Sequence, residues 1–380
     1  MTVSLWQRSR NPERDQCDTV VIGAGVCGLG AAIELESRNV RTIVVDRGAV
    51  GGGASGRNAG FLMLGAAENY QAAIDTWGRD TARMLWAWTE DNLSALRTLG
   101  VESLESFDPI GSCLLALEQD EADQLEASRD LMREDGFDVE LLRSGTDSAW
   151  SSGRAILGLL NPDDAVVDPV ELVRWLASLL DAPVCEHEEV TSIESSSRGA
   201  TVRTSEREIA CDRVLVCVNA HARHLLPQIA PLVEPNRGQM LAARMAGVRL
   251  DHAYYANHGS EYVRPGPDGL IVVGGKRTSD HANEVGEQQG TSQRVQREIE
   301  TFARELFGVE PEVVARWSGT MGFSSDGLPM IGPTDADRRV WFAGGFTGHG
   351  MSMGFLAGRR AAGCALEGKD SPLPIARFGP

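Results

Sequence analysis

The sequence predicts an α/β fold in two parts: a mostly parallel sheet flanked by helices, and an α+β part built on an antiparallel sheet. Three observations support this prediction. Residues 20–32 have the pattern of a buried strand, a glycine turn and a helix. Residues 237–275 alternate strand-like runs with turns, as antiparallel sheets do. A second glycine-rich turn, residues 344–350, lies between another strand and another helix.

The first glycine turn has the spacing of a dinucleotide-binding motif. Gly23, Gly25 and Gly28 fill the pattern G-x-G-x-x-G, with Val26 and Cys27 between the last two. The first glycine makes the tight turn, the second lets the backbone approach a pyrophosphate, and the third lets helix and strand pack closely. Free N–H groups and the helix dipole favour an anion there. The motif predicts a Rossmann-like dinucleotide-binding domain; the alternative is a glycine-rich turn that binds nothing.

The next predicted strand, residues 41–45, ends in an acid. Asp46 lies about 20 residues after the glycine motif, where a carboxylate accepts hydrogen bonds from a ribose diol. The loop 51–60 that follows is dense in glycine and carries Arg57 and Asn58. Because such a loop cannot pack a core by itself, we expect it to contact the ligand.

Helical spacing dominates the following segment. It predicts a helix over residues 69–100, with core anchors at Trp77, Leu85, Trp88, Leu93 and Leu96. The alternative for the tryptophans is a binding role. A strand over 112–117 and an acidic helix with a solvated face over 118–135 complete this region.

The pattern of residues 168–218 predicts a helix and further strands of the parallel sheet. The pattern predicts a helix over 168–180, with Asp168 as its N-cap and Pro169 in its first turn. Short strands are expected over 188–194, 200–204 and 213–218. The last is apolar throughout, as in a strand covered on both faces. It ends in Asn219 and Ala220, at the carboxyl edge of the sheet where ligands bind.

The second glycine turn favours a flavin over a nicotinamide cofactor. Nearby patterns predict a hairpin across 265–269, a helix over 290–307, strands over 313–319 and 340–343, and a helix over 351–366. A simple nicotinamide dehydrogenase rarely needs a second such turn, whereas a flavin ring lies far from its adenosine. A helix N-terminus beside that ring would stabilise the negative charge of the reduced flavin.

Composition excludes several classes of partner. The chain has 380 residues and a net charge of −18, which argues against nucleic acid and anionic membrane surfaces. No apolar run approaches the ~20 residues of a membrane span, and residues 1–16 show no secretory signal, so we expect a cytoplasmic protein. The seven cysteines form no C-x-x-C pair and the histidines no H-E-x-x-H cluster. We therefore expect free thiols and no metal site.

Four blocks together resemble the superfamily of D-amino-acid oxidase, glycine oxidase and sarcosine oxidase, which are FAD-dependent amine oxidoreductases. The blocks are residues 20–32, 53–60, 168–172 and 326–351, in the family's order. The resemblance implies a discontinuous FAD-binding domain over residues 17–75, 150–230 and 314–380. It implies a substrate domain over residues 76–149 and 231–313.

The resemblance also implies which residues hold the cofactor. The diphosphate would lie on the first glycine turn, the adenosine ribose on Asp46, the adenine near Val190, and the pyrimidine end of the flavin under residues 345–351. The expected FAD contacts are Gly23, Gly25, Val26, Cys27, Gly28, Asp46, Arg47, Gly53, Ala54, Ser55, Arg57, Asn58, Ala59, Gly60, Val190, Asn219, Ala220, Gly345, Phe346, Thr347, Gly348, His349, Gly350 and Met351. Alternatively, Ser55 and Asn58 are ordinary turn residues that do not contact the cofactor. The turn around His349 could likewise bind the cofactor through its backbone alone, without the imidazole.

Two departures from the family pattern matter. Some relatives attach FAD through a cysteine before the Asp-Gly-x-Pro block, or through a histidine in the loop. Here residues 319–325 hold no cysteine and Arg57 stands in the loop, so we expect non-covalent FAD. Amino-acid oxidases of the family often carry a carboxylate-binding arginine where this chain has Met321. Either Arg264 or Arg277 takes that role, or the substrate is an amine without a carboxylate at that point.

The resemblance implies oxidation of a C–N bond in a small amine or amino acid, with hydride transfer to flavin N5 and hydrolysis of the imine. Electrons would pass to O₂ or to another acceptor. Tyr254 and Tyr255 are further candidates on the substrate side; the alternative for Lys276 is a hairpin end. Other readings are a non-catalytic flavin-binding subunit, an amine dehydrogenase with a non-oxygen acceptor, an NAD dehydrogenase, and a flavoenzyme acting on macromolecules. The candidate catalytic residues are Lys276, His258, Tyr262, Arg264 and Met321.

Overall fold

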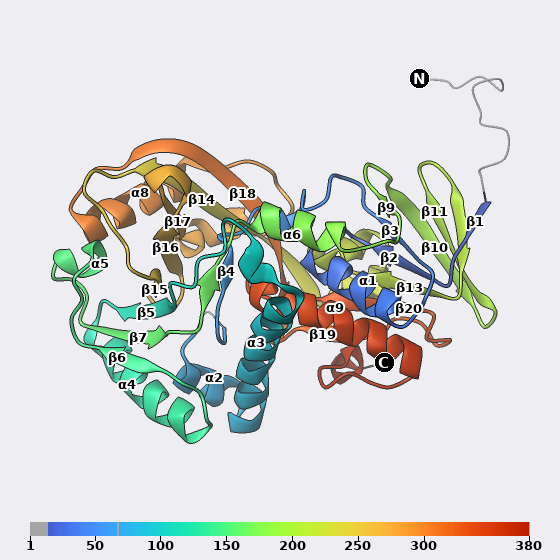
Figure 1. Ribbon diagram of the computed structural model, residues 1–380, viewed down its shortest axis with the longest axis horizontal. Helices are drawn as coiled ribbons and strands as arrows, with labels where there is room; N and C mark the ends of the chain where they lie inside the picture. Colours follow the sequence, from blue (N-terminus) through green and yellow to red (C-terminus); the bar gives the residue numbers. More distant parts are fainter. Residues whose placement is uncertain (1–13, 67, 380) are drawn as a thin grey trace.

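The computed structural model describes residues 14–66 and 68–379, and two large sheets organise them (Figure 1). The smaller of the two has six strands. All neighbouring strands in it are parallel except one pair at the edge of the sheet, in which β19 runs antiparallel to β20. The order of its strands is β19 (Met330–Pro333), β20 (Val340–Gly344), β13 (Arg213–Val216), β2 (Thr19–Ile22), β3 (Thr42–Val45) and β9 (Val184–Cys185).

Two helices packed on this sheet explain several of its glycines. They are α1 (Val26–Ser37) and α9 (Gly350–Glu367), which lie side by side. A Cβ on Gly358 would stand 1.8 Å from the carbonyl oxygen of Cys27, so only glycine allows this approach. A Cβ on Gly28 would likewise stand 1.8 Å from the Gly23 carbonyl oxygen. The Rossmann-like prediction is confirmed, including the packing role of Gly28.

The larger sheet has eight strands and is mostly antiparallel. Its one parallel pair joins β15 to β5. The order of its strands is β18 (Glu312–Ser324), β14 (Val233–Arg244), β17 (Ile271–Gly275), β16 (Glu261–Pro265), β15 (Ala253–Ala256), β5 (Ser112–Ala116), β7 (Leu157–Asn161) and β6 (Glu140–Leu142). The predicted hairpin is present, because Pro265 of β16 pairs with Ile271 of β17.

Helices cover the larger sheet. The apolar face of α8 (Gln293–Phe307) contributes Ile299, Phe302 and Leu306 to a core shared with β14–β17. Of the remaining helices, α3 (Arg79–Leu99) packs against α9 and α6 (Pro169–Ser178) against α1. The others are α2 (Tyr70–Trp77), α4 (Gln119–Glu134), α5 (Ser148–Ser151) and α7 (His281–Glu284). None of the helices in the described ranges is both long and apolar enough to cross a bilayer.

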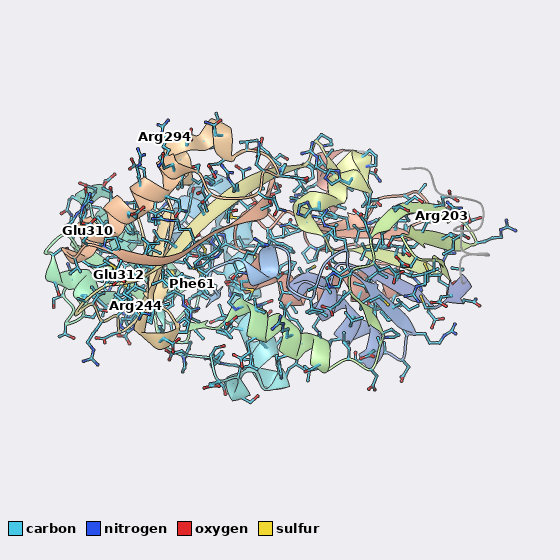
Figure 2. The ribbon with its side chains drawn as sticks, turned by 90° about the horizontal axis from the view of Figure 1, so that it is seen from above. Phe61, Arg203, Arg244, Arg294, Glu310 and Glu312 are labelled. Carbon is cyan, nitrogen blue, oxygen red and sulfur yellow. The ribbon has the colours of Figure 1, made fainter. Side chains whose placement is uncertain are left out.

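Two small sheets complete the fold. The strands of the first are β1 (Arg14–Gln16), β12 (Glu208–Cys211), β11 (Gly199–Thr204) and β10 (Val190–Ser196), and those of the second are β4 (Phe61–Leu62) and β8 (Ala165–Val166). Figure 2 shows Arg203 of β11 near one end of the molecule and the paired residues Arg244 and Glu312 near the other. Phe61 of β4 lies between these ends.

The predicted helix over 69–100 is two helices. The helical conformation is interrupted at Gly78, whose φ of 81° lies in the region that favours glycine, and α2 therefore ends at Trp77. The core prediction holds for Leu85, Trp88, Leu93 and Leu96, which are buried. Trp77 is only partly buried, and its indole N–H donates to the carbonyl oxygen of Asp326 (2.9 Å).

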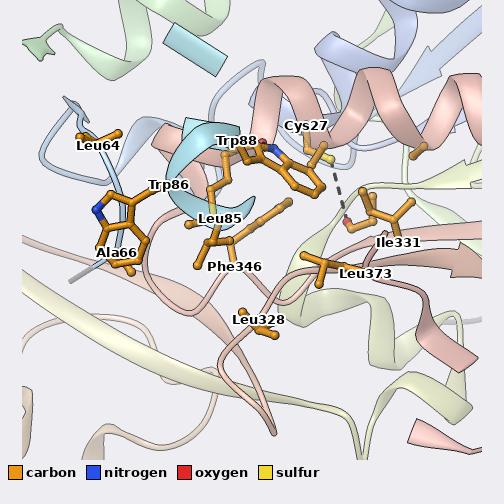
Figure 3. Close-up of a cluster of buried hydrophobic side chains, with 14 of the residues drawn as sticks. Cys27, Leu64, Ala66, Leu85, Trp86, Trp88, Leu328, Ile331, Phe346 and Leu373 are labelled. Atoms are coloured by element: carbon orange, nitrogen blue, oxygen red, sulfur yellow. Dashed lines mark hydrogen bonds between the residues drawn. The ribbon is translucent and has the colours of Figure 1, made fainter. Parts of the chain in front are cut away.

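The core is continuous across the junction of the two halves. The indole N–H of Trp88 on α3 donates to the carbonyl oxygen of Met353 on α9 (3.3 Å). Figure 3 shows part of this cluster around Leu85, Trp88 and Phe346. The boundaries between the FAD-binding and substrate domains stay a prediction. Two strands inside the predicted FAD-binding domain pair instead with strands of the larger sheet. Strand β7 and most of β18 belong to the eight-stranded sheet, because their ladders pair with β5 and β14.

Candidate functional site

Two cavities meet at the carboxyl end of the parallel strands. The first, here the glycine-turn cavity, has a volume of about 330 Å³ and is lined by Gly23, Gly25, Asp46, Ser55 and Val190, among others. The second, here the aromatic cavity, has about 460 Å³ and is lined by aromatic and second-turn residues. Both linings include Ala54, Arg57, Asn219 and Gly319. The two cavities therefore adjoin, one on each glycine turn.

The glycine-turn cavity has the features of a diphosphate site. Helix α1 begins after Gly25, and the N–H of Val26 donates to the hydroxyl oxygen of Ser55 (3.1 Å). A Cβ on Gly25 would stand 2.7 Å from that same oxygen, so the backbone here is open only because the residue is glycine. The Ser55 hydroxyl oxygen thus accepts a hydrogen bond from an N–H group at the helix N-terminus. A helix N-terminus is also where a phosphate oxygen accepts such bonds.

Asp46 has the environment expected of a ribose-binding acid. It follows β3, and its two carboxylate oxygens accept the N–H groups of Ala24 (2.7 Å) and Gly48 (2.8 Å). These bonds fix the carboxylate at the cavity wall. Because each carboxylate oxygen accepts more than one hydrogen bond, both retain capacity for ribose hydroxyls.

The second glycine turn is tied to the first sheet through Asn219. The side-chain oxygen of Asn219, at the start of the 3₁₀ turn η4 (Asn219–His224), accepts the N–H of Gly345 (2.8 Å). Residues 346–349 and Met351 then line the aromatic cavity, just before and within the first turn of α9. This places a helix N-terminus at the cavity wall, as the sequence predicted.

His349 presents an unused acceptor in this turn. Its Nδ1 lies 3.2 Å from the carbonyl oxygen of Thr347 and so carries the proton, since a carbonyl only accepts. Its Nε2 is buried and has no hydrogen-bond partner among the described residues. Burial lowers the pKa of this imidazole to about 4, so the ring is neutral at physiological pH.

Several predicted cofactor residues lie behind the cavity walls. Cys27 is buried, with its sulfur 4.0 Å from the Ala343 carbonyl oxygen, and Ala220 is buried in a core cluster of the six-stranded sheet. Their contribution is to packing behind the turns. The predicted contacts that line neither cavity are Val26, Cys27, Gly28, Ala220, Gly345 and Gly350; the remaining members of the predicted set line one or both.

Aromatic rings form one wall of the second cavity. Tyr255 and Tyr262 both pack against Phe61, with ring centroids 4.7 and 6.2 Å away. Burial raises the pKa of both phenols well above the ordinary range, so they stay neutral. Phe61, Phe323 and Trp77 also line this cavity and were not predicted as site residues. Phe61 directly follows the glycine-dense loop, and this position in the sequence could have identified it as a site residue.

The two candidate arginines are in different situations. Arg264 is buried, and its guanidinium donates to the carbonyl oxygens of Ala59 (2.9 Å), Val167 (2.9 Å) and Pro265 (2.7 Å). It lines neither cavity. The predicted substrate role of Arg264 therefore conflicts with the structure, in which backbone acceptors already engage its donors.

Arg277 follows β17 and lines the aromatic cavity. Its guanidinium lies over the Phe323 ring, 4.5 Å from the centroid. Burial lowers the pKa of the guanidinium, and the negative charges of Glu234 and Glu284 oppose that effect. Within the described ranges it has neither a hydrogen-bond nor an ion-pair partner. Its donors are thus free to bind an anion.

Of the remaining catalytic candidates, three line the aromatic cavity and one does not. His258, Tyr262 and Met321 line the aromatic cavity. Lys276 does not; its ammonium is 3.4 Å from a carboxylate oxygen of Glu261 and lies over the Phe302 ring. The structure thus places Lys276 at a hairpin end, the alternative that its sequence context had left open.

Three residues that share no sequence motif come together beside the glycine-turn cavity. His221 and His224 of η4 face Glu287, and the ligand atoms of all three lie within 4.8 Å of one another. The sequence predicted no metal site, because the histidines form no H-E-x-x-H or similar cluster; the structure brings Glu287 to them from 63 residues beyond His224.

A Rossmann-like sheet with two glycine turns facing adjoining cavities, beside a large antiparallel sheet, defines the flavin-dependent oxidoreductase class. The chain belongs to the FAD dependent oxidoreductase family, whose model matches residues 18–363. It is an FAD-dependent enzyme acting on C–N bonds.

Curated relatives and solved structures agree with this assignment. The chain is 26% identical to a glycine oxidase of Geobacillus kaustophilus, over 95% of this chain and 96% of that protein. It is 24% identical to a gamma-glutamylputrescine oxidoreductase of Escherichia coli, over 91% and 83%. The crystal structure of glycine oxidase from G. kaustophilus superposes with a TM-score of 0.77 at 22% identity, covering 96% of this chain and 98% of that one. This likeness establishes the fold.

Proposed function

We propose that the protein oxidises the C–N bond of a small amino acid whose carboxylate is bound by Arg277. The observation that supports this proposal is a half-buried guanidinium, free of hydrogen-bond partners among the described residues, in the wall of the aromatic cavity. Partial burial removes some of the water that would otherwise solvate this cation, and an anion in the cavity would offset that cost. A substrate carboxylate is such an anion, and a guanidinium binds it through two parallel hydrogen bonds.

The cavity suits a small substrate. Its walls contribute an apolar surface from the rings of Phe61, Tyr255 and Tyr262 and the thioether of Met321, and the same cavity is also lined by Arg57, Glu68 and Asp326. A bound FAD supplies the two-electron acceptor. Glycine oxidases and an iminodiacetate oxidase of similar fold are named for small amino acids, which agrees with this assignment.

The residues that would hold FAD are those of the two glycine turns. Gly25 and the start of α1 would bind the diphosphate, and Asp46 the ribose. His349 would offer its neutral Nε2 as a hydrogen-bond acceptor at the ring end, where a charged imidazole would offer only donors.

A second candidate function is oxidation of an amine that has no carboxylate near the reacting carbon. Met321 favours it, because a thioether lines the cavity where amino-acid oxidases of this family often place an arginine. A relative that is 24% identical to this chain is named gamma-glutamylputrescine oxidoreductase.

Anaerobic reduction of the bound flavin distinguishes the two candidates. Glycine, N-methylglycine, D-alanine, L-proline and iminodiacetate are compared with putrescine and its N-acyl derivatives, and bleaching of the flavin absorbance is followed. We expect a carboxylate-bearing amine to bleach the flavin. Arg277→Gln should then weaken its apparent affinity roughly ten- to hundredfold, because a charge-assisted pair is lost.

The control variant is Arg294→Gln, which removes an exposed arginine of α8 that lines neither cavity. It should leave the affinity unchanged. Bleaching only by amines without a carboxylate, with equal affinity in wild type and Arg277→Gln, would refute the amino-acid proposal. Flavin that no amine reduces would instead support a non-catalytic flavin subunit. Mixing the reduced enzyme with O₂ then shows whether oxygen is its acceptor.

A further inference from the structure

We propose that His221, His224 and Glu287 bind one divalent transition-metal ion of the zinc type, and that this ion holds residues 285–289 on the rim of the glycine-turn cavity. The proposal is independent of the substrate. It rests on the geometry of the three side chains and on where their backbone segments lie.

The geometry around Glu287 is that of ligands around a common centre. His221 Nδ1 and Glu287 Oε1 lie 3.3 Å apart. Both atoms are buried, and neither has a hydrogen-bond partner within the described ranges, so their contact lacks the alignment of a hydrogen bond. Two ligand atoms bound to a tetrahedral zinc at 2.0–2.1 Å stand roughly 3.3 Å apart. An unsatisfied buried pair at that separation is explained by a cation between its members.

His224 completes the ligand set from the solvent side. Its Nε2 lies 2.8 Å from the other carboxylate oxygen of Glu287, and its side chain is 57% exposed. The imidazole can therefore turn toward an ion without disturbing the core. Two imidazoles and one carboxylate are donors that zinc prefers, and such three-residue sets leave a fourth position for water.

The position of the cluster indicates what the ion does. His221 and His224 belong to η4, which follows β13 of the six-stranded sheet. Glu287 lies after α7, in the connection that leads from the eight-stranded sheet to α8. Gln288 and Gln289, directly after Glu287, line the glycine-turn cavity together with both histidines. A metal bound here would join two walls of the cavity and slow the release of the dinucleotide.

The test uses the FAD-loaded full-length protein, stripped with a chelator and then dialysed against ZnCl₂. Bound zinc is measured by mass spectrometry and affinity by competition with a chromogenic chelator. We expect one zinc per chain. His224→Ala and Glu287→Gln should each weaken zinc binding by at least about tenfold, because each removes a ligand. The matched control is His281→Ala, an exposed histidine on the neighbouring helix α7.

The second measurement is the rate of FAD release with and without zinc. Zinc should slow release in the wild type and in His281→Ala, and should have no effect in the two ligand variants. Glu287→Gln retains the size and hydrogen-bonding capacity of the side chain, so it separates metal binding from folding. A wild type that takes up no zinc, or ligand variants that retain it, would overturn the site. Zinc binding that leaves FAD release unchanged would overturn its role at the rim.

Discussion

The buried carboxyl of Asp164 should make the protein less stable as the pH rises from about 4 to about 7. Asp164 lies between β7 and β8, and it accepts the N–H of Leu64 (2.9 Å) and the hydroxyl of Ser112 (2.5 Å). Burial raises its pKa to about 7, and these two hydrogen bonds only partly oppose that effect. The folded state therefore holds this proton more tightly than the unfolded chain does.

The sign and size follow from proton linkage. Between the unfolded pKa near 3.8 and the folded pKa near 7, the folded protein binds more protons, so the free energy of unfolding falls as pH rises. A shift of about three units corresponds to at most about 4 kcal/mol. The entropy of unfolding of a chain of this size is on the order of 0.8 kcal/mol/K. The expected contribution to Tm is then up to about 5 °C.

The assay compares wild type and Asp164→Asn by calorimetry at pH 5 and pH 8. The amide keeps an acceptor for Leu64 and donates to the Ser112 oxygen, but it never ionises. We expect the Tm of the variant to exceed that of the wild type by up to about 2 °C at pH 5, where the unfolded carboxyl has already ionised, and by up to about 5 °C at pH 8. The control is Asp163→Asn, an exposed neighbour. A Tm difference between wild type and Asp164→Asn that does not change with pH would refute the reasoning.

Two further predictions concern the cofactor. Gly28→Ala places a Cβ 1.8 Å from the Gly23 carbonyl oxygen, so the turn must open, and titration with FAD should show affinity weakened by at least about tenfold, which is about 1.4 kcal/mol. Gly247→Ala is the comparison in an exposed turn, where a Cβ meets no atom within 4 Å but the φ of 77° strains an alanine, so it controls for destabilisation away from the site; equal affinity in both variants would contradict the packing role of Gly28. Acid precipitation should release all flavin into the supernatant, because residues 319–325 hold no cysteine and position 57 is an arginine. Yellow colour retained in the washed pellet would show a covalent bond.

The cofactor half of the site was predictable because its chemistry is encoded in contiguous residues. The spacing of Gly23, Gly25 and Gly28 requires no distant partner, and Asp46 follows a strand whose direction the local pattern already indicates. The same holds for the second turn, which lies between β20 and α9 as predicted. Local pattern was less informative at Gly78, where one glycine with positive φ divides an otherwise continuous helical pattern.

The substrate side was not predictable to the same degree. Arg264 and Arg277 belong to the same antiparallel region and looked equivalent along the sequence. Arg264 points to the carbonyl oxygens of Ala59 and Val167, which come from distant parts of the chain. Arg277 leaves its strand after Lys276, whose φ of 56° turns the chain so that the guanidinium reaches the aromatic cavity. Only the packing of the two sheets decides between them.

The sequence by itself determined the fold class, the family and the positions of the two glycine turns where we propose that the dinucleotide binds, because hydrogen bonding within a strand–turn–helix unit depends on near neighbours. The tertiary structure alone decided which arginine is free to bind an anion. It also decided that His224 meets Glu287, 63 residues further along the chain. Such contacts depend on how whole sheets and their connections pack against each other, and no short-range periodicity in the sequence records that packing.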